Sequence, residues 1–255
     1  MLIKRVNVLG VGISVLNLST ALSAIAGAVQ ERRKGYICVT GVHGVMEAQQ
    51  DPEFKAILNR ALLCTPDGVP MVWAGKLNGF TEIDRVYGPD LLLTICAWSE
   101  KSGCRHFFLG GAEGVAETLV KKLRDKFPGL IVAGTYTPPF RALNVGEELN
   151  LREQVRSARP DLIWVGLSTP KQERFMAEFL PKLETTLMVG VGAAFDFHSG
   201  RVKQAPRWMQ RRGLEWFYRL CQEPRRLARR YLRNNPRFIW QFSGQLLGLK
   251  KYPPV

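Results

Sequence analysis

The sequence predicts an α/β fold: a parallel sheet with crossover helices, followed by a basic helical C-terminal appendage. Apolar strand-like runs alternate with helical patterns over most of the chain, which is typical of a parallel sheet connected by helices. The character changes beyond Asp196, because residues 201–249 are basic, aromatic and helical in pattern. We therefore expect a core over residues 1–200 and an amphipathic, surface-seeking appendage over residues 201–255.

The core is expected to contain six apolar strands separated by helices. The expected strands are Tyr36–Thr40, Leu62–Thr65, His106–Leu109, Ile131–Thr135, Leu162–Gly166 and Leu187–Gly192. Helical patterns are expected at Val45–Gln50, Val69–Leu77, Gly88–Glu100, residues 115–127, Glu147–Ala158 and Gln172–Phe179. In the appendage, Pro224 and Pro236 are expected to separate short helices, because proline suits a helix start and not its interior.

The N-terminal segment has two interpretations. Lys4-Arg5 followed by an apolar stretch is compatible with a signal peptide. We favour two short strands around a turn at Gly10–Gly12, followed by a helix from Ala21 that is capped by Ser19-Thr20. The sequence contains no run of 18 apolar residues, so no membrane-spanning helix is expected.

The positive charge lies almost entirely in the appendage. Residues 1–200 hold 22 basic and 20 acidic groups, whereas residues 201–255 hold 14 basic and 2 acidic groups. Such a field attracts nucleic acid, anionic lipid or diphosphate ligands, and charge alone does not choose among them.

Several classes of site have no support in the sequence. The five cysteines are scattered without a C-x-x-C pair, which argues against a disulfide framework and a zinc site and for a reducing compartment. There is also no D-x-D pair, no His/Asp/Glu cluster with metal-ligand spacing and no G-x-S-x-G motif. We therefore expect neither a metal nor a cofactor, and no acyl hydrolase.

The strongest catalytic candidate is Asp67, in the turn Thr65-Pro66-Asp67-Gly68. Ligands of open parallel sheets bind at the carboxyl ends of strands, where a carboxylate can act as a general base. Thr40 ends the preceding strand, so Thr40 and His43 are expected to reach the same crevice. The alternative is that Asp-Gly only makes a turn and that His43 is structural.

Other strand-to-helix junctions are candidates for binding a ligand. Gly110-Gly111 opens a glycine-rich turn before a helix, where backbone N–H groups can hold a diphosphate. Gly166 is followed by Thr169, which is expected to cap a helix with Pro170 in its first position. Lys171 and Gln172 would then face the crevice, as would Gly192 and Asp196 after the last strand. Each junction is also explained by turn and cap chemistry alone.

The arginines of the appendage are the remaining candidates. Arg219, Arg226 and Arg229 can provide guanidinium groups for diphosphate oxygens, whereas Arg225 and Arg230 are expected among lipid headgroups. A solvated helix face is the alternative for each of them.

Three stretches of the chain closely resemble the WecG/TagA/CpsF glycosyltransferase family. They are VTGVHGVMEAQQDPEFKAILNRALLCTPDGVPMVWAGKL, VGLSTPKQERFMAEFL and VGVGAAFDFHSGRVKQAPRWMQRRGLEWFYRLCQEPRR. The resemblance covers roughly residues 3–240, with order and spacing preserved, and the motifs around Asp67, Gln172 and Asp196 are specific only in combination.

This resemblance implies a Rossmann-like enzyme that inverts the anomeric centre without a metal. It would move a sugar from a UDP donor to an undecaprenyl-diphosphate-linked acceptor, in the synthesis of cell-surface polysaccharides such as teichoic acids or exopolysaccharides. Asp67 matches the family's proposed base, Thr40 a residue near it, and Arg219, Arg226 and Arg229 arginines that close over the donor diphosphate. The appendage is implied to contact the inner face of the cell membrane from the cytoplasm and to compete with self-association into a homo-oligomer.

The chain departs from the family at one position. Many members carry asparagine two residues after the threonine, whereas this chain has Val42 followed by His43. A polar sugar contact is lost there, and His43 is a candidate to replace it. N-acetylmannosamine, its uronic acid and glucose all remain candidate donor sugars.

Two other classes of protein fit the sequence less well. A Rossmann-like oxidoreductase needs a dinucleotide fingerprint with an acidic residue about 20 positions on, which is missing. A nucleic-acid-binding module is disfavoured, because the basic tail is patterned into apolar helical faces.

Overall fold

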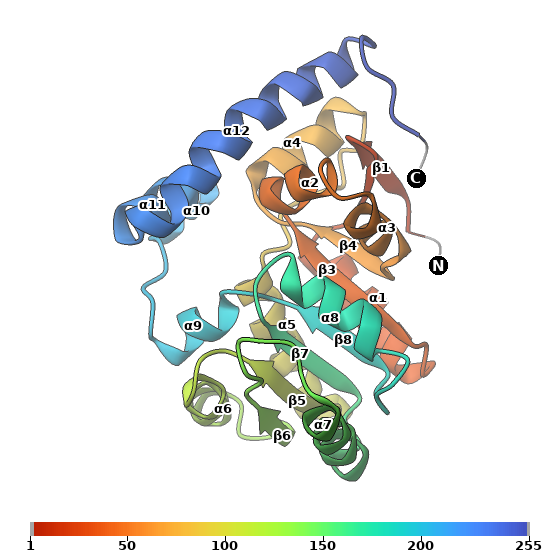
Figure 1. Ribbon diagram of the computed structural model, residues 1–255, viewed down its shortest axis with the longest axis vertical. Helices are drawn as coiled ribbons and strands as arrows, with labels where there is room; N and C mark the ends of the chain where they lie inside the picture. The colour runs from red at the N-terminus through yellow and green to blue at the C-terminus, as the bar shows by residue number, and fades with distance from the viewer. Residues whose placement is uncertain (1–2, 254–255) are drawn as a thin grey trace.

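The computed structural model describes residues 3–253 and is centred on a six-stranded parallel sheet (Figure 1). The strand order is β4-β3-β8-β7-β5-β6, and every neighbouring pair is parallel. The strands are β3 (Gly35–Thr40), β4 (Leu63–Pro66), β5 (Arg105–Gly110), β6 (Ile131–Tyr136), β7 (Leu162–Gly166) and β8 (Leu187–Gly190). The predicted α/β fold is confirmed, and so are all six predicted strands.

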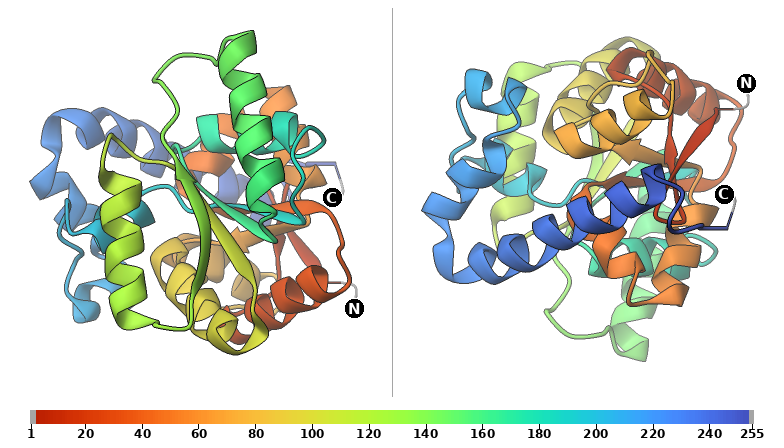
Figure 2. Two further views of the ribbon diagram at one scale, coloured as in Figure 1. Left: turned by 90° about the horizontal axis from the view of Figure 1, so that it is seen from below. Right: turned by 90° about the horizontal axis from the view of Figure 1, so that it is seen from above.

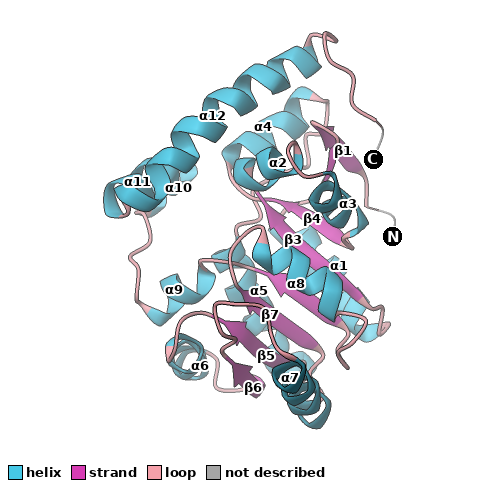
Figure 3. Cartoon of the chain, in the orientation of Figure 1, coloured by secondary structure: helices cyan, strands magenta, loops and turns pink. Residues whose placement is uncertain are grey.

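Helices cover both faces of the sheet (Figure 3). One face packs on α1 (Leu18–Gln30), α5 (Gly88–Ser102), α6 (Val115–Lys126) and α9 (Ala194–Ser199). The other packs on α2 (Val42–Ala48), α3 (Pro52–Arg60), α7 (Val145–Ala158) and α8 (Lys171–Phe179). Adjacent strand residues alternate between these layers, as the pleat requires: Ile37 joins the first and Cys38 the second.

The ends of the chain add to the second layer. An antiparallel hairpin of β1 (Arg5–Val8) and β2 (Val11–Ser14) begins the described part, as predicted. The other elements are α4 (Val69–Leu77), α10 (Arg207–Arg211), α11 (Glu215–Gln222) and α12 (Pro224–Leu246). Figure 2 shows α12 crossing one end of the molecule, where it packs on α2.

Two boundaries in the N-terminal half differ from the prediction. Helix α1 begins at Leu18 rather than Ala21, because Asn17 is the cap. Its side chain accepts from the Thr20 N–H at 3.1 Å, while the Thr20 hydroxyl accepts from the Asn17 N–H at 2.9 Å. The segment after Thr40 holds two helices, since α2 starts at Val42 and α3 was not predicted.

The prediction that Pro236 separates two helices is wrong. Residues 224–246 form one helix with Pro236 inside it, whereas Pro224 does begin a helix as expected. An interior proline removes a hydrogen bond and costs about 3 kcal/mol. Phe238 and Phe242 follow it, stack at 5.6 Å and are buried in the core, and this apolar burial offsets the cost. No helix within residues 3–253 has the length and apolar character needed to cross a membrane.

The far end of α12 is held by the N-terminal hairpin. The Gln245 side chain accepts from the Leu9 N–H at 2.8 Å and donates to the Asn7 carbonyl at 2.8 Å. Asn7 in turn donates from its amide to the Pro253 carbonyl at 2.7 Å. The last helix is therefore fixed to the hairpin by hydrogen bonds from its Gln245 side chain, as well as to the core by apolar contacts.

The register places the carboxyl ends of the strands side by side. Thr40 pairs with Pro66, Gly110 pairs with Gly166, and Gly190 pairs with Val165 on β7 and Cys38 on β3. The loops that follow these strands therefore gather along one edge of the sheet.

We predict that Gly110→Ala destabilises the protein by about 3 kcal/mol, from backbone strain and overpacking together. Gly110 has φ of +121°, and a Cβ there would lie 2.6 Å from the Gly166 carbonyl oxygen. Gly103→Ala is the matched control, because Gly103 also has a positive φ (+69°) but faces open space; it should cost only about 1 kcal/mol. Urea unfolding measures both, and equal losses would contradict the role of the close strand contact.

Candidate active site

Asp67 lies where the edge strand β4 ends, beside the end of β3. Its N–H donates to the Thr40 carbonyl at 3.0 Å. Gly68 has φ of +88°, and this left-handed glycine lets α4 start immediately at Val69. A Cβ on Gly41 would lie 2.9 Å from the Asp67 carbonyl oxygen, so the two loops are in close contact. As predicted, Asp67 and Thr40 come together at the carboxyl edge of the sheet.

The surroundings of Asp67 make its carboxyl group a weaker acid than usual. Burial raises the pKa of Asp67 to about 6, and the nearby Glu215 carboxylate acts in the same direction. Arg85 and Arg219 oppose this by favouring the charged form. The side chain keeps some contact with solvent. A carboxylate whose pKa lies near neutrality is suited to accept a proton.

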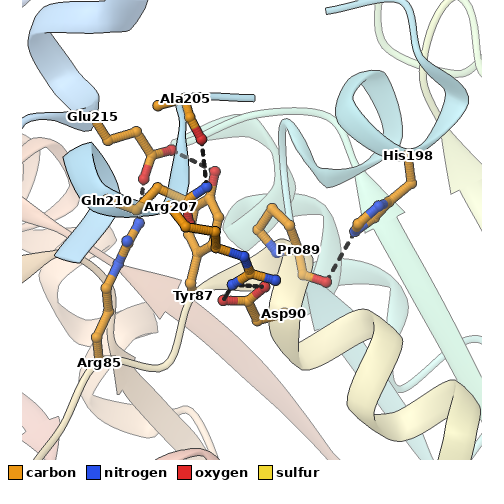
Figure 4. A network of polar contacts seen from close by, with 9 residues as sticks. All are labelled: Arg85, Tyr87, Pro89, Asp90, His198, Ala205, Arg207, Gln210 and Glu215. Atoms are coloured by element: carbon orange, nitrogen blue, oxygen red, sulfur yellow. Dashed lines mark hydrogen bonds and ion pairs between the residues drawn. The ribbon is translucent and has the colours of Figure 1, made fainter. Parts of the chain in front are cut away.

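A polar network beside Asp67 joins the C-terminal helices to the core (Figure 4). The carboxylate of Glu215, at the start of α11, accepts from the Arg85 guanidinium and from the Tyr87 hydroxyl. The Arg85 guanidinium also lies 4.0 Å from the centre of the Tyr87 ring. Burial alone would lower the pKa of Arg85, yet the Asp67 and Glu215 carboxylates raise it. Arg85 is therefore a fixed cation between two carboxylates.

Three further contacts in Figure 4 hold the segment before α11, and two of them reach the start of α5. The His198 Nε2 atom of α9 lies 2.9 Å from the Pro89 carbonyl. Arg207 of α10 reaches Asp90 at 3.3 Å, and the Gln210 amide donates to the Ala205 carbonyl at 2.7 Å. The segment between the last strand and α11 is thus attached to α5 at separate points.

Thr40 and His43 are turned toward neighbouring elements. The Thr40 hydroxyl is buried and accepts from the Cys64 thiol at 3.2 Å. His43 is half-buried, with Nδ1 at 3.2 Å from the Asn234 amide of α12. Burial, and then Arg230, lower the pKa of His43 to about 4, so its ring is neutral near pH 7. Whether Thr40 and His43 contact a substrate stays a prediction.

The glycine-rich junctions are in mutual contact at the same edge. The Gly111 N–H donates to the Gly166 carbonyl at 3.0 Å, and a Cβ on Gly166 would lie 2.8 Å from the Phe195 ring. Helix α6 begins only at Val115 and has no side-chain cap. The Val115 N–H donates to the Ala112 carbonyl at 3.0 Å, so a ligand would have to use the N–H groups that follow it in the first turn.

The junction after β7 differs from the expected helix cap. Helix α8 begins at Lys171, with Pro170 as its uncapped N-cap, and the Thr169 hydroxyl donates to Glu173 at 2.8 Å. The Thr169 hydroxyl does not cap the helix, because the buried Glu173 carboxylate needs hydrogen-bond donors and takes this one. Burial raises the pKa of Glu173, which the Thr169 and Gln172 hydrogen bonds oppose.

Of the two residues expected to face the crevice at this junction, one is buried. The Gln172 amide donates to Glu173 at 3.0 Å and accepts from the Gly192 N–H at 3.0 Å, whereas Lys171 is exposed. Gln172 therefore ties the loop after β7 to the loop after β8. A ligand role for Lys171, Gln172 and Gly192 stays a prediction.

The predicted arginines are placed differently from one another. Arg219 is half-buried against the Phe197 ring, with a buried Nε that has no partner among the described residues. Arg226 is exposed and pairs with Glu223, and Arg229 is exposed. Burial raises the pKa of Asp196, and Arg226 and Arg219 are among the charges that lower it. Asp196 therefore lies near two of the three predicted arginines.

Arg230 is a site candidate that the sequence reading missed. It was expected among lipid headgroups, but it is half-buried, its Nε has no partner in the described chain, and burial lowers its pKa. It lies on the inward stripe of α12 with Leu227 and Asn234. That spacing of three and four residues was a signal in the sequence. Arg85, Tyr87 and Glu215 had no such signal, because their partners are about 130 residues away.

The fold and the residues at the carboxyl edge of the sheet together define an α/β enzyme. It places a carboxyl group with a pKa near neutrality, and several arginines, at the ends of parallel strands. Comparison with known proteins identifies the family. A profile described as "Glycosyl transferase WecG/TagA/CpsF family" matches residues 6–252. The chain belongs to this family and is a glycosyltransferase, so the oxidoreductase alternative is excluded.

Two curated relatives carry the same printed name, N-acetylglucosaminyldiphosphoundecaprenol N-acetyl-beta-D-mannosaminyltransferase. The protein of Bacillus spizizenii (strain ATCC 23059 / NRRL B-14472 / W23) is 31% identical over 213 residues, covering 83% of this chain and 81% of the relative. The protein of Bacillus subtilis (strain 168) is 31% identical over 182 residues, covering 71% and 69%.

We predict that Glu215→Ala costs about 3 kcal/mol of unfolding free energy, because it leaves the Arg85 cation and the Tyr87 hydroxyl without their partner. Arg156→Ala is the control, since it breaks an exposed pair with Glu153 and should cost less than about 1 kcal/mol. Chemical denaturation measures both, and hydrogen exchange should show faster opening of α11 in the first variant only. Equal effects would mean that the network does not hold the C-terminal helices.

Proposed function

We propose that the enzyme transfers a sugar from a UDP donor to an undecaprenyl-diphosphate-linked acceptor in cell-surface polysaccharide biosynthesis. The observation that carries the proposal is Asp67, a carboxyl group with a pKa of about 6 at a strand end, beside the fixed cation Arg85. The relatives' names describe a sugar transfer to a lipid-linked diphosphate acceptor, which supports the same chemistry here. The reaction takes place at the inner face of the membrane, with the enzyme bound peripherally.

In the proposed reaction, Asp67 accepts the proton of an acceptor hydroxyl. The hydroxyl oxygen attacks the anomeric carbon, and the bond from that carbon to the UDP oxygen breaks with its electron pair leaving on UDP. A single displacement of this kind inverts the anomeric centre. Negative charge develops on the leaving diphosphate. The half-buried Arg219, together with Arg226 and Arg229, is proposed to stabilise this charge without a metal. N–H groups in the first turn of α6, after the Gly110-Gly111 turn, provide further donors.

The donor sugar is N-acetylmannosamine, its uronic acid or glucose. The relatives' names support the first. Val42 provides no polar contact, and His43, held neutral beside Asn234, is the polar group nearest to that position in sequence. A screen of UDP-sugars against a short-chain lipid-diphosphate acceptor, with mass-spectrometric detection of the product, identifies the donor.

Residues 201–255 are proposed to act as the membrane-associating part of the enzyme. They carry 14 basic and 2 acidic groups, and their exposed apolar side chains include Trp216, Phe217 and Trp240. Aromatic and cationic side chains together favour an anionic membrane surface.

We predict that Asp67→Asn lowers kcat by about 10²- to 10⁴-fold, the usual contribution of a general base. Asparagine keeps the size of the side chain but accepts no proton. UDP binding, measured by thermal shift, should stay unchanged, because the substitution leaves the arginines in place. Near-normal transfer by this variant would show that Asp67 is not the base.

The pH profile of kcat/KM should report the ionisation of Asp67. The base works only when deprotonated and burial raises its pKa to about 6, so activity should rise about tenfold per pH unit below 6 and level off above it. Arg85→Gln should move this limb to higher pH, because Arg85 lowers the pKa of Asp67. If the acidic limb of the profile stays at the same pH in the Arg85→Gln variant, a group other than Asp67 controls that limb.

A further inference from the structure

A pocket of about 370 Å³ opens beside α4. Helix α4 contributes Val69, Val72, Trp73 and Lys76, which follow the i, i+3, i+4, i+7 spacing of a single helix face. Helix α10 contributes Arg207 and Gln210 from across the opening. A Cβ on Gly213 would lie 3.2 Å from Val69, so the turn after α10 closes the pocket at the start of α4.

The floor of the pocket is the polar network that surrounds the base. Arg85, Tyr87 and Asp90 line the pocket and appear together in Figure 4. Arg85 and Asp90 both affect the pKa of Asp67, in opposite directions. Asp67 does not line the pocket itself, but these two lining residues bring the pocket close to the proposed base. The start of α5 also brings the pocket near the loop after β8, because a Cβ on Gly88 would lie 3.2 Å from the Val191 carbonyl oxygen.

The pocket combines apolar and cationic groups at its mouth. Trp73 is 61% exposed, and Leu77, four residues further along the same helix, is 65% exposed. Lys76 is exposed and forms no ion pair with any residue between 3 and 253. Arg207 pairs with Asp90 at 3.3 Å, but its side chain is 71% exposed, and such a surface pair is worth less than about 1 kcal/mol. Lys76 is therefore free to contact an anion, and Arg207 can exchange Asp90 for an anion at little cost.

We propose that this pocket binds the lipid-linked diphosphate acceptor. Lys76 and Arg207 contact the diphosphate, Trp73 and Leu77 contact the first units of the polyprenyl chain, and the sugar reaches inward to Asp67. Indole rings beside cations suit a ligand that is apolar at one end and anionic at the other. This inference rests on the proposed function and deepens it by giving the acceptor a site of its own.

The exposed apolar groups decide between acceptor and donor. The polyprenyl chain belongs to the acceptor, and the donor carries no such chain. Trp73 and Leu77 are exposed on α4, where they suit an apolar chain. We therefore assign the pocket to the acceptor and the carboxyl ends of the strands to the donor.

The test compares two acceptors that share one sugar diphosphate, N-acetylglucosamine diphosphate, and carry either a farnesyl or a methyl group. Trp73→Ala should raise KM for the farnesyl acceptor at least tenfold and leave KM for the methyl acceptor unchanged. Lys76→Gln and Arg207→Gln should each raise KM for both acceptors several-fold. The KM for the UDP-sugar and the affinity for UDP should not change. Phe140→Ala is the control, because Phe140 is 89% exposed and follows β6 at the opposite edge of the sheet.

The outcomes separate this inference from the proposed function. A rise in the donor KM instead would assign the pocket to the donor, and no change in either KM would leave the pocket without a substrate; both overturn the inference while Asp67 keeps its role. If no acceptor is used at all, the proposed function fails. Calorimetric titration with farnesyl diphosphate then decides for the pocket: binding that Lys76→Gln weakens supports it, and absence of binding to the unmodified enzyme overturns it.

Discussion

The site depends on one buried ionic contact, between Glu215 at the start of α11 and Arg85 before α5. It sets the charge around Asp67, because Arg85 favours the carboxylate while Glu215 disfavours it. It also fixes the helices that carry Arg219 and Arg230. A buried charge pair adds little net stability when compared with apolar packing. Its value here is to couple the position of the C-terminal helices to the ionisation of Asp67.

The loops after β5, β7 and β8, at the carboxyl edge of the sheet, are rigid for a different reason. Gly110, Gly166 and Gly192 permit close approaches that any Cβ would obstruct or strain, and Gln172 joins two of the loops through Glu173 and the Gly192 N–H. These loops hold one another by short-range contacts, whereas α10 to α12 are held by the Glu215 network, the Asp90 pair and the hairpin. The molecule thus combines a stiff set of loops at the carboxyl edge of the sheet with a C-terminal segment attached at separate points.

The sequence predicts what depends on local periodicity. All six sheet strands and the span of α4 followed from apolar patterns, and the edge that collects Asp67 and Thr40 followed from the geometry of parallel sheets. Pro236 was misread because the tertiary packing of Phe238 and Phe242 outweighs proline's local preference. The partners of Arg85 and Gln245 were beyond prediction, because nothing local marks a contact between segments so far apart in the chain. An inward-facing Arg230 could have been predicted, because Arg230 lies on the helical stripe from Leu227 to Asn234.

The hydrogen bond between Leu9 of the hairpin and Gln245 of α12 joins residues 236 positions apart. Contacts of such long range form late, since they require closure of a large loop. On the ribosome, the parallel sheet can be completed once β8 has emerged, but Glu215 and Gln245 are translated afterwards. The nascent chain therefore carries a finished sheet before its C-terminal helices are in place, and the fold is complete only after the first and last described elements have met.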